Sequence, residues 1–220
     1  EAHAGPGTVL LAQHRVKEAK QSFEEALRLK PGLVPAHYGL ALCYKELGLD
    51  FKAEACFRQA LQHDTEHVPS HMGLARLLVE SAGLYEQAYE CYQAAMRLSP
   101  QHPTAAPEAV NVLEKLGRFD EAWQRLQELM RRPDPPIPFA TAVAVTFADL
   151  CNKVDRCDGA LAMVEQVLAR GDNEPMEEGQ RIVLHFAAGR ILDNKGQYDA
   201  AFAHYARGNT IAWDMAQRQP

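Results

Sequence analysis

One five-residue stretch has the residue types of a metal-dependent hydrolase. Residues 63–67 read HDTEH. On an uninterrupted helix, His63 and His67 would lie one turn apart and could hold a zinc ion, with Glu66 as the general base. Pro69 follows two residues later, and comparable positions elsewhere in the chain carry helix-ending prolines. We therefore expect the helix to end within this stretch, and we interpret it as a polar turn without metal.

Four histidines are a second candidate for chemistry. His3, His37 and His71 follow one another at intervals of 34 residues, and His185 occupies a related position later in the chain. Such a ladder could titrate near pH 6.5 or ligate metal. If each lies in a separate helical repeat, however, neighbouring histidines are two helix spacings of ~8–10 Å apart, whereas zinc needs nitrogens ~2 Å away. We predict half-buried packing histidines and no shared metal site.

Other catalytic patterns are missing from the sequence. It contains no G-x-S-x-G elbow, no P-loop and no glycine-rich dinucleotide fingerprint. The five cysteines are odd in number and form no CxxC pair, so we expect reduced, packed thiols in a cytoplasmic protein; they are Cys43, Cys56, Cys91, Cys151 and Cys157. The sequence therefore predicts no catalytic residues, no cofactor and no enzyme activity within these 220 residues.

Charge and hydropathy exclude two further classes of protein. The formal net charge is −6, and both halves of the chain carry a slight acidic excess, so the basic footprint of a nucleic-acid binder is missing. No apolar run approaches the ~20 residues of a membrane-spanning helix, so we expect no membrane insertion. The sequence begins at Glu1 without Met, and we expect that the first residues of the natural protein are absent.

The elements that position these residues repeat along the chain. Residues 37–41 read HYGLA, and residues 71–75 read HMGLA, 34 positions later. In 34-residue rows one column is always alanine: Ala19, Ala53, Ala88, Ala122, Ala160 and Ala201. A large apolar residue follows four positions later, as in Phe23 and Phe57, and a small or aliphatic residue follows three further on. Glycine is common five positions before the alanine, with an inserted residue in row three.

This spacing predicts helical hairpins. Residues four and three apart share a helix face, so Ala19, Phe23 and Ala26 make one apolar stripe. The glycine ends the preceding helix, and Pro31, Pro100 and Pro133 end the following one. Each hairpin leaves an apolar face that only the next hairpin can bury. The chain is therefore predicted to be an all-α stack of hairpins.

These columns resemble the tetratricopeptide repeat (TPR) family. The resemblance covers six rows, about 1–33, 34–67, 68–102, 103–136, 141–170 and 182–215, and implies a right-handed α-solenoid of about six helix-turn-helix hairpins. The segment RRPDPPIPF (131–139) carries four prolines and predicts an extended linker. We expect repeats one to four in 1–133, a proline-rich linker or kink in 134–140, and repeats five and six with a C-terminal helix in 141–220. Row five has Asp155 in place of the turn glycine, and GDNEP (171–175) is predicted to be a second loop.

The resemblance implies a concave groove, lined by the first helix of each hairpin, that binds a protein or peptide partner. Carried over position by position, the candidate groove residues are Tyr38, Gly39, Leu42, Met72, Gly73, Arg76, Glu108, Asn111, Asp149, Asn152, Phe186, Arg190 and Asn194. Arg76 and Arg190 are expected to pair with partner carboxylates. Gly39 and Gly73 are open to another interpretation, namely that each lies under a neighbouring helix.

Three functions stay open at this point. The first is a non-catalytic scaffold that binds a protein partner in the groove. The second follows from residues 184–209, LHFAAGRILDNKGQYDAAFAHYARGN, which resemble the last repeat of bacterial TPR–sulfotransferase proteins; the chain would then recruit a partner or substrate for a catalytic domain beyond Pro220. The third is self-association through the end repeat, because residues 198–217 carry Phe202, Tyr205, Ile211 and Trp213.

Overall fold

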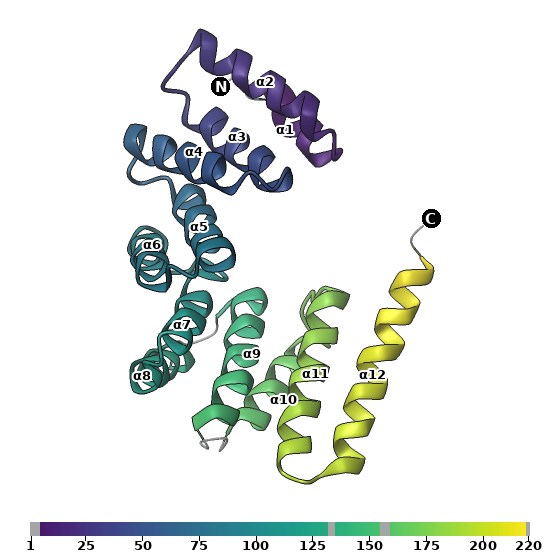
Figure 1. Cartoon of the computed structure of the whole chain (residues 1–220). Helices are drawn as coiled ribbons and strands as arrows, with labels where there is room; N and C mark the ends of the chain where they lie inside the picture. The colour runs from purple at the N-terminus through teal and green to yellow at the C-terminus, as the bar shows by residue number, and fades with distance from the viewer. Residues whose placement is uncertain (1–4, 132–134, 155–158, 219–220) are drawn as a thin grey trace. The chain divides into compact units, whose positions relative to one another are not determined.

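The structure is a computed structural model that describes residues 5–131, 135–154 and 159–218. All regular secondary structure within these residues is helical, which confirms the all-α prediction (Figure 1). The chain divides into two compact units, which we call unit 1 (residues 1–100) and unit 2 (residues 101–220).

Unit 1 consists of three helical hairpins. Helices α1 (Gly5–Ala12) and α2 (Val16–Leu29) form the first, and α3 (Val34–Glu46) and α4 (Asp50–His63) form the second. The third pairs α5 (Val68–Leu77) and its π-helical extension η1 (Leu78–Ala82) with α6 (Tyr85–Leu98). We call the first helix of each hairpin the inner helix and the second the outer helix.

Unit 2 also consists of three hairpins in its described residues. Helices α7 (Ala105–Lys115) and α8 (Phe119–Met130) form the first, and α9 (Ile137–Val154) and α10 (Ala160–Arg170) the second. Helices α11 (Glu178–Asn194) and α12 (Tyr198–Gln217) form the third. In both units an outer helix packs on its own inner helix and, where the next hairpin follows, on that inner helix too, as α2 does on α3 and α10 on α11. Within the described residues the helices form six hairpins, the number that the rows predicted.

The alanine column lies where the helices touch. Each of the six alanines is at most 2% exposed. The large apolar residue four positions later is also buried in the first five rows and half-buried in the sixth; these residues are Phe23, Phe57, Tyr92, Leu126, Val164 and Tyr205. Because alanine has only a methyl group, the helix backbones approach closely at these positions, and the aromatic ring fills the space beside them.

Local sequence explains where the helices begin and end. Pro35 and Pro69 lie in the first turns of α3 and α5, where a missing N–H costs no helical hydrogen bond. The turn between α3 and α4 uses Gly48 at a φ of 68°, a conformation that glycine adopts without steric cost. In the first hairpin the corresponding residue is His14, at a φ of 57°. The left-handed turn conformation is therefore kept even where glycine is absent.

The inserted residue of row three lies in a π-helical turn. The inner helix continues from α5 into η1, and the N–H of Leu84 donates to the carbonyl of Leu78 at 3.1 Å. A π-helical turn holds one residue more than an α-helical turn, so it absorbs an insertion without breaking the helix. The apolar face of α6 consequently returns to register, and Ala88 is fully buried.

The predicted linker at 134–140 is wrong from Ile137 onward. Helix α9 begins at Ile137, and the N–H of Ala140 donates to the carbonyl of Pro136 at 2.9 Å. Pro138 falls in the first turn, where proline is tolerated. Ile137 and Phe139 are buried, and burying them favours the earlier start of the helix. Residues 132–134 lie outside the described residues, as does Asp155 of row five.

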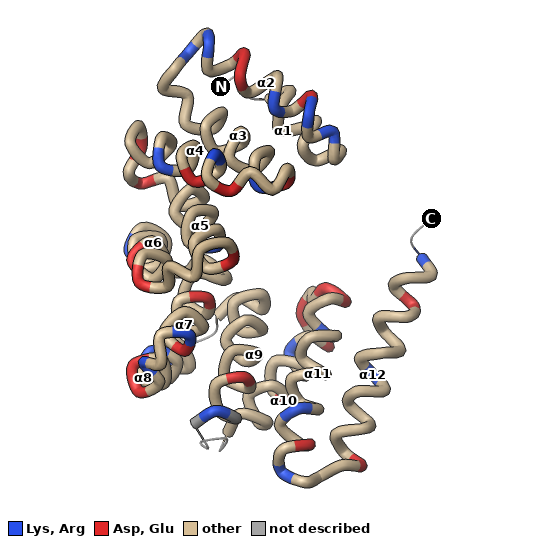
Figure 2. Tube along the Cα trace, viewed as in Figure 1, with Lys and Arg blue, Asp and Glu red and all other residues tan. Residues whose placement is uncertain are grey.

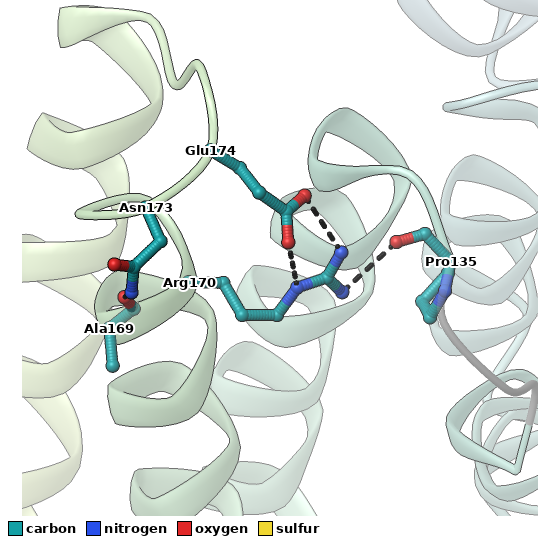
Figure 3. A network of polar contacts seen from close by, with 5 residues as sticks. All are labelled: Pro135, Ala169, Arg170, Asn173 and Glu174. Atoms are coloured by element: carbon teal, nitrogen blue, oxygen red, sulfur yellow. Dashed lines mark hydrogen bonds and ion pairs between the residues drawn. The ribbon is translucent and has the colours of Figure 1, made fainter.

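A hydrogen bond links Pro135, which precedes α9, to Arg170, the last residue of α10. The guanidinium of Arg170 donates to the carbonyl of Pro135 at 3.1 Å and makes two hydrogen bonds of 3.1 Å to the carboxylate of Glu174 (Figure 3). Glu174 belongs to the predicted loop 171–175, which is non-helical as expected.

The boundary between the two units lies after residue 100, whereas the sequence predicted a division at residue 133. The fourth hairpin groups with the fifth and sixth, because α7 and α8 both pack on α9. The ring of Trp123 on α8 lies 5.3 Å from that of Phe147 on α9, centroid to centroid. The proline-rich sequence gives no sign that the helices before it, α7 and α8, pack on the helix after it, α9. Within the described residues, no helix combines the length and apolarity required to cross a membrane.

Candidate functional site

The candidate groove residues lie on the inner helices, as predicted, but they fall into two sets. Tyr38, Leu42 and Arg76 with their neighbours belong to α3 and α5 of unit 1, where α1 contacts α3 and α3 contacts α5. The later candidates belong to α7, α9 and α11 of unit 2, which also contact one another in order. The two sets therefore form two candidate faces, one in each unit.

Gly39 and Gly73 are packing residues. Gly39 is buried, which contradicts its assignment to an open groove, whereas Gly73 is half-buried. A Cβ on Gly39 would lie within 2.6 Å of the Phe23 ring, which belongs to the preceding hairpin. A Cβ on Gly73 would lie 2.5 Å from Cε1 of Phe57 in the same way. These glycines make room for an aromatic ring of the outer helix before them, which is the alternative that the sequence left open.

Met72 is also buried, with 4% of its surface exposed, so its assignment to an open face is wrong. Leu42 is half-buried and Arg76 is exposed on the next inner helix. The candidates of unit 1 with accessible side chains are therefore Tyr38, Leu42 and Arg76, which we call the unit 1 face.

Tyr38 packs on the outer helix of its own hairpin and on the turn that leads to the next. Its ring lies 5.9 Å from that of Phe57 on α4 and 5.5 Å from the imidazole of His67, which it meets edge-on. Burial raises the pKa of the Tyr38 hydroxyl, and the positive charge of Arg76 acts in the opposite direction. The guanidinium of Arg76 therefore lies close enough to the half-buried phenol for its charge to act on it.

Charged residues are unevenly distributed over unit 1. Figure 2 shows them at intervals along α2 and α4, whereas α3 carries charges only in its last turn and α5 only at Arg76. Lys45 at the end of α3 forms an ion pair of 2.8 Å with Glu80 of η1. Apart from Arg76, the residues of α3 and α5 around the unit 1 face are thus uncharged up to the last turn of α3, where the Lys45–Glu80 ion pair lies.

Arg190 has an internal partner on the unit 2 face. Its guanidinium donates to the carboxylate of Asp149 at 2.6 Å, which links α11 to α9. The expected pairing of Arg190 with a partner carboxylate must therefore compete with Asp149. Asn111 and Asn194 are exposed and Glu108 is half-buried, whereas the side chain of Asn152 lies outside the described residues.

Phe186 is half-buried against the last helix. Its ring lies 6.2 Å from that of Tyr205 on α12. A Cβ on Gly189 would come within 2.5 Å of the Tyr205 ring, so Tyr205 occupies the same kind of site in this hairpin as Phe23 does in the first. Phe186 therefore depends on α12 for its position.

Comparison with known families now assigns the repeated unit. Residues 34–67 and 68–102 each match the tetratricopeptide repeat family. Residues 34–102 are two tetratricopeptide repeats. Their bounds are those of the second and third predicted rows, and the second match includes the π-helical insertion. No curated protein matches the chain in sequence.

Solved structures of tetratricopeptide repeat proteins extend this fold over most of the chain. The PilF protein of Pseudomonas aeruginosa is 20% identical, with 92% of this chain and 87% of that chain covered and a TM-score of 0.69. PilW, described as a widely conserved type IV pilus biogenesis factor, is 18% identical, with 94% and 90% covered and a TM-score of 0.71. YrrB, described as having an unusual peptide-binding site, is 16% identical, with 86% and 91% covered and a TM-score of 0.54. At these identities the likeness shows the fold.

The HDTEH stretch is a turn between two tetratricopeptide repeats, as predicted. Helix α4 ends at His63 and α5 begins at Val68, so the two histidines do not share a helix. The carboxylate of Asp64 accepts a hydrogen bond of 2.9 Å from the N–H of Glu66, and His67 contacts the hydroxyl of Ser70 at 2.8 Å. Across the described residues, no group of three or more His, Cys, Asp or Glu is arranged to hold a metal ion.

Two of the four histidines contact the turn that precedes their own repeat. Nε2 of His37 lies 2.7 Å from the carbonyl oxygen of Pro31, and Nε2 of His71 lies 2.9 Å from that of Thr65. In both repeats the imidazole can donate to the carbonyl six residues earlier, which confirms packing as its role. His185 instead contacts His204, and His3 lies outside the described residues.

The cysteines of unit 1 are packed thiols, as expected. Burial raises the pKa of Cys43, Cys56 and Cys91 to about 11. A thiol with such a pKa is almost entirely protonated at neutral pH and is a poor nucleophile.

Sequence reasoning missed two features of the faces. Lys45 and Glu80 form a pair across repeats, although their position at the ends of successive inner helices could have suggested it. His67 forms part of the packing around Tyr38 but lies in a turn, where helical periodicity gives no signal.

Proposed function

We propose that this chain is a non-catalytic scaffold and that the unit 1 face binds a segment of a protein partner. The observation that carries this proposal is that the side chains of Tyr38, Leu42 and Arg76 are accessible on two adjoining inner helices, α3 and α5, which carry few charges. An extended or helical segment could lie across α3 and α5 there.

The chemistry of the unit 1 face favours a particular kind of segment. Tyr38 and Leu42 lie one helical turn apart on α3, and each is only partly buried, so together they offer apolar surface to a partner side chain. Arg76 on α5 offers a planar guanidinium that suits a carboxylate. The expected ligand is therefore an apolar residue near an acidic residue or a carboxyl terminus.

The unit 2 face is a second, weaker candidate for contact with the partner. Asn111 and Asn194 are exposed amides, and Arg190 must exchange Asp149 for a partner carboxylate. Because both carboxylates would be solvent-exposed, such an exchange would contribute little affinity. The peptide-binding site in the description of YrrB supports a peptide as the ligand class, although that site belongs to YrrB itself.

A peptide selection with matched variants tests this proposal. Peptides selected from a random display library on the wild-type chain are measured against Tyr38→Ala/Arg76→Ala and against Phe51→Ala/Arg58→Ala. The second variant removes the same kinds of group, one aromatic ring and one guanidinium, from exposed positions of the outer helix α4. We expect at least about tenfold weaker binding by the first variant and no change in the second. Equal binding by both would show that the wrong surface was chosen.

The recruiting role in a sulfotransferase stays a prediction from residues 184–209. It requires a sulfotransferase domain encoded after Pro220, and the length of the natural reading frame tests it. A frame that ends close to residue 220 would reject this role and leave the scaffold proposal intact.

A further inference from the structure

The last two helices of unit 2 share a pair of histidines. His185 of α11 and His204 of α12 face each other with their Nδ1 atoms 3.1 Å apart and their ring centroids 5.3 Å apart. His185 is 9% exposed and His204 is half-buried. At this distance one Nδ1 must carry the hydrogen and the other must accept it.

This contact lies in the middle of the packing between α11 and α12. Tyr205 follows His204 directly and packs over Gly189, and Gly208, one turn later, lies against the Cβ of His185. The hydrogen bond between the two imidazoles therefore sits among the close contacts that hold α12 in place.

The pair can accept two protons, and the two have different effects. The first can bind to Nε2 of the donor ring, which leaves the hydrogen bond between the Nδ1 atoms intact but makes that ring a cation. The second must bind to the accepting Nδ1, after which two N–H groups face each other. Two donors cannot form a hydrogen bond, and two cations at this separation repel each other.

The groups around the pair mostly oppose protonation. Burial lowers the pKa of His185, and the charges of His204, Arg207 and Arg181 lower it further. Burial and Arg207 lower the pKa of His204, while Glu165 of α10 acts in the opposite direction. Since unfolding would restore the ordinary value of 6.5, the neutral pair is favoured in the fold, and stability is lost as the pH falls below 6.5.

We propose that the His185–His204 pair is a pH-sensitive switch that holds α12 on α11 near neutral pH and weakens this contact when both imidazoles are protonated. It does not depend on the partner binding proposed for unit 1. Because Phe186 packs on Tyr205, opening α12 also changes the surroundings of Phe186 on the unit 2 face.

Hydrogen–deuterium exchange at pH 7.5 and pH 5.0 tests the switch. After correction for intrinsic exchange rates, the opening equilibrium of α12 in the wild type should rise about fivefold or more at pH 5.0, the size expected for one lost hydrogen bond. His204→Asn should remove this rise, because an amide can donate to neutral His185 and turn its oxygen toward protonated His185.

His14→Asn is the matched control. It makes the same change at an exposed turn residue with a φ of 57°, which asparagine tolerates, so it should behave as the wild type. Unchanged α12 protection in the wild type, or an equal loss in His204→Asn, would overturn the proposal.

An imidazole titration by NMR covers the case in which His204→Asn fails to dock α12 even at pH 7.5. In the wild type the two rings should titrate as a coupled pair, and the α12 amide shifts should follow the second proton. Two independent single-step titrations without any response of α12 would also overturn the proposal.

Discussion

The ring of Phe23 lies against Gly39 of the next hairpin, so closely that a Cβ on Gly39 would come within 2.6 Å of its Cε1. Phe57 and Gly73 repeat this relationship one hairpin later. Each aromatic ring thus fits a site that only glycine leaves open, and this fit sets how successive hairpins of unit 1 stack.

Gly39→Ala is expected to destabilise unit 1. The new methyl group would overlap the buried Phe23 ring and lower the free energy of unfolding by about 1–3 kcal/mol, the usual cost of overpacking a core. Gly5→Ala is the control, since a Cβ there meets nothing within 4 Å. Urea unfolding followed by circular dichroism measures both.

The double variant Phe23→Leu/Gly39→Ala separates overlap from a general effect of alanine. Leucine is smaller than phenylalanine, so the combined loss should be less than the sum of the two single losses. Strict additivity would show that Gly39 and Phe23 do not compete for the same space.

Much of the fold could be predicted from the sequence, but fewer of the residues that line the unit 1 and unit 2 faces. The period of the alanine column predicts which side of each helix is buried, and the burial of Ala19 and Ala53 confirms it. Periodicity cannot show which neighbouring hairpin covers a small residue, so it could not reveal that the Phe23 ring covers Gly39 or that Phe57 packs on Gly73. The pairing of Asp149 with Arg190 was also missed, because 41 residues separate them and only the packed helices bring them together.

The thiols of unit 1, one buried and two half-buried, are expected to react slowly. With a pKa raised from 9.0 to about 11, Cys43, Cys56 and Cys91 at pH 8 hold about a hundredfold less thiolate than an ordinary thiol. Iodoacetamide labelling followed by peptide mass spectrometry should therefore be at least that much slower in the native chain than in urea.

The same thiols predict the direction of alkaline destabilisation. Their stabilising contribution is fully present below pH 9.0 and is lost as the pH rises toward 11, because only the unfolded chain ionises in that range. Labelling at equal rates in native and urea-unfolded chain at pH 8 would contradict the burial of these residues.

The Asp149–Arg190 ion pair is expected to contribute little to stability. Its side chains are 44% and 42% exposed, so a double-mutant cycle with Asp149→Asn and Arg190→Gln should give a coupling energy of about 0.2–1 kcal/mol. The coupling should shrink at 1 M salt, where charges are screened beyond about 3 Å. A larger coupling that salt does not change would mean that the pair is less exposed than the structure shows.

Self-association through the last repeat stays a prediction that the exposed side chains of α12 make testable. Phe202 is 73% exposed and Trp213 is 67% exposed. If these residues join two copies, light scattering at increasing concentration should show a mass above that of one 24.5 kDa chain, and Phe202→Glu/Trp213→Glu should restore the monomer. Phe51→Glu, at a 91% exposed residue of unit 1, is the control and should not change the mass. A wild-type monomer at every concentration would reject this idea.

Site-specific photo-crosslinking tests most directly whether a partner lies on the inner helices of unit 1, as we propose. A benzophenone amino acid replaces either Leu42 on the inner helix α3 or Phe51 on the outer helix α4, in cells that naturally make the protein. We expect a partner adduct from position 42 and none from position 51. Adducts from position 51 alone, or equally from both positions, would contradict it.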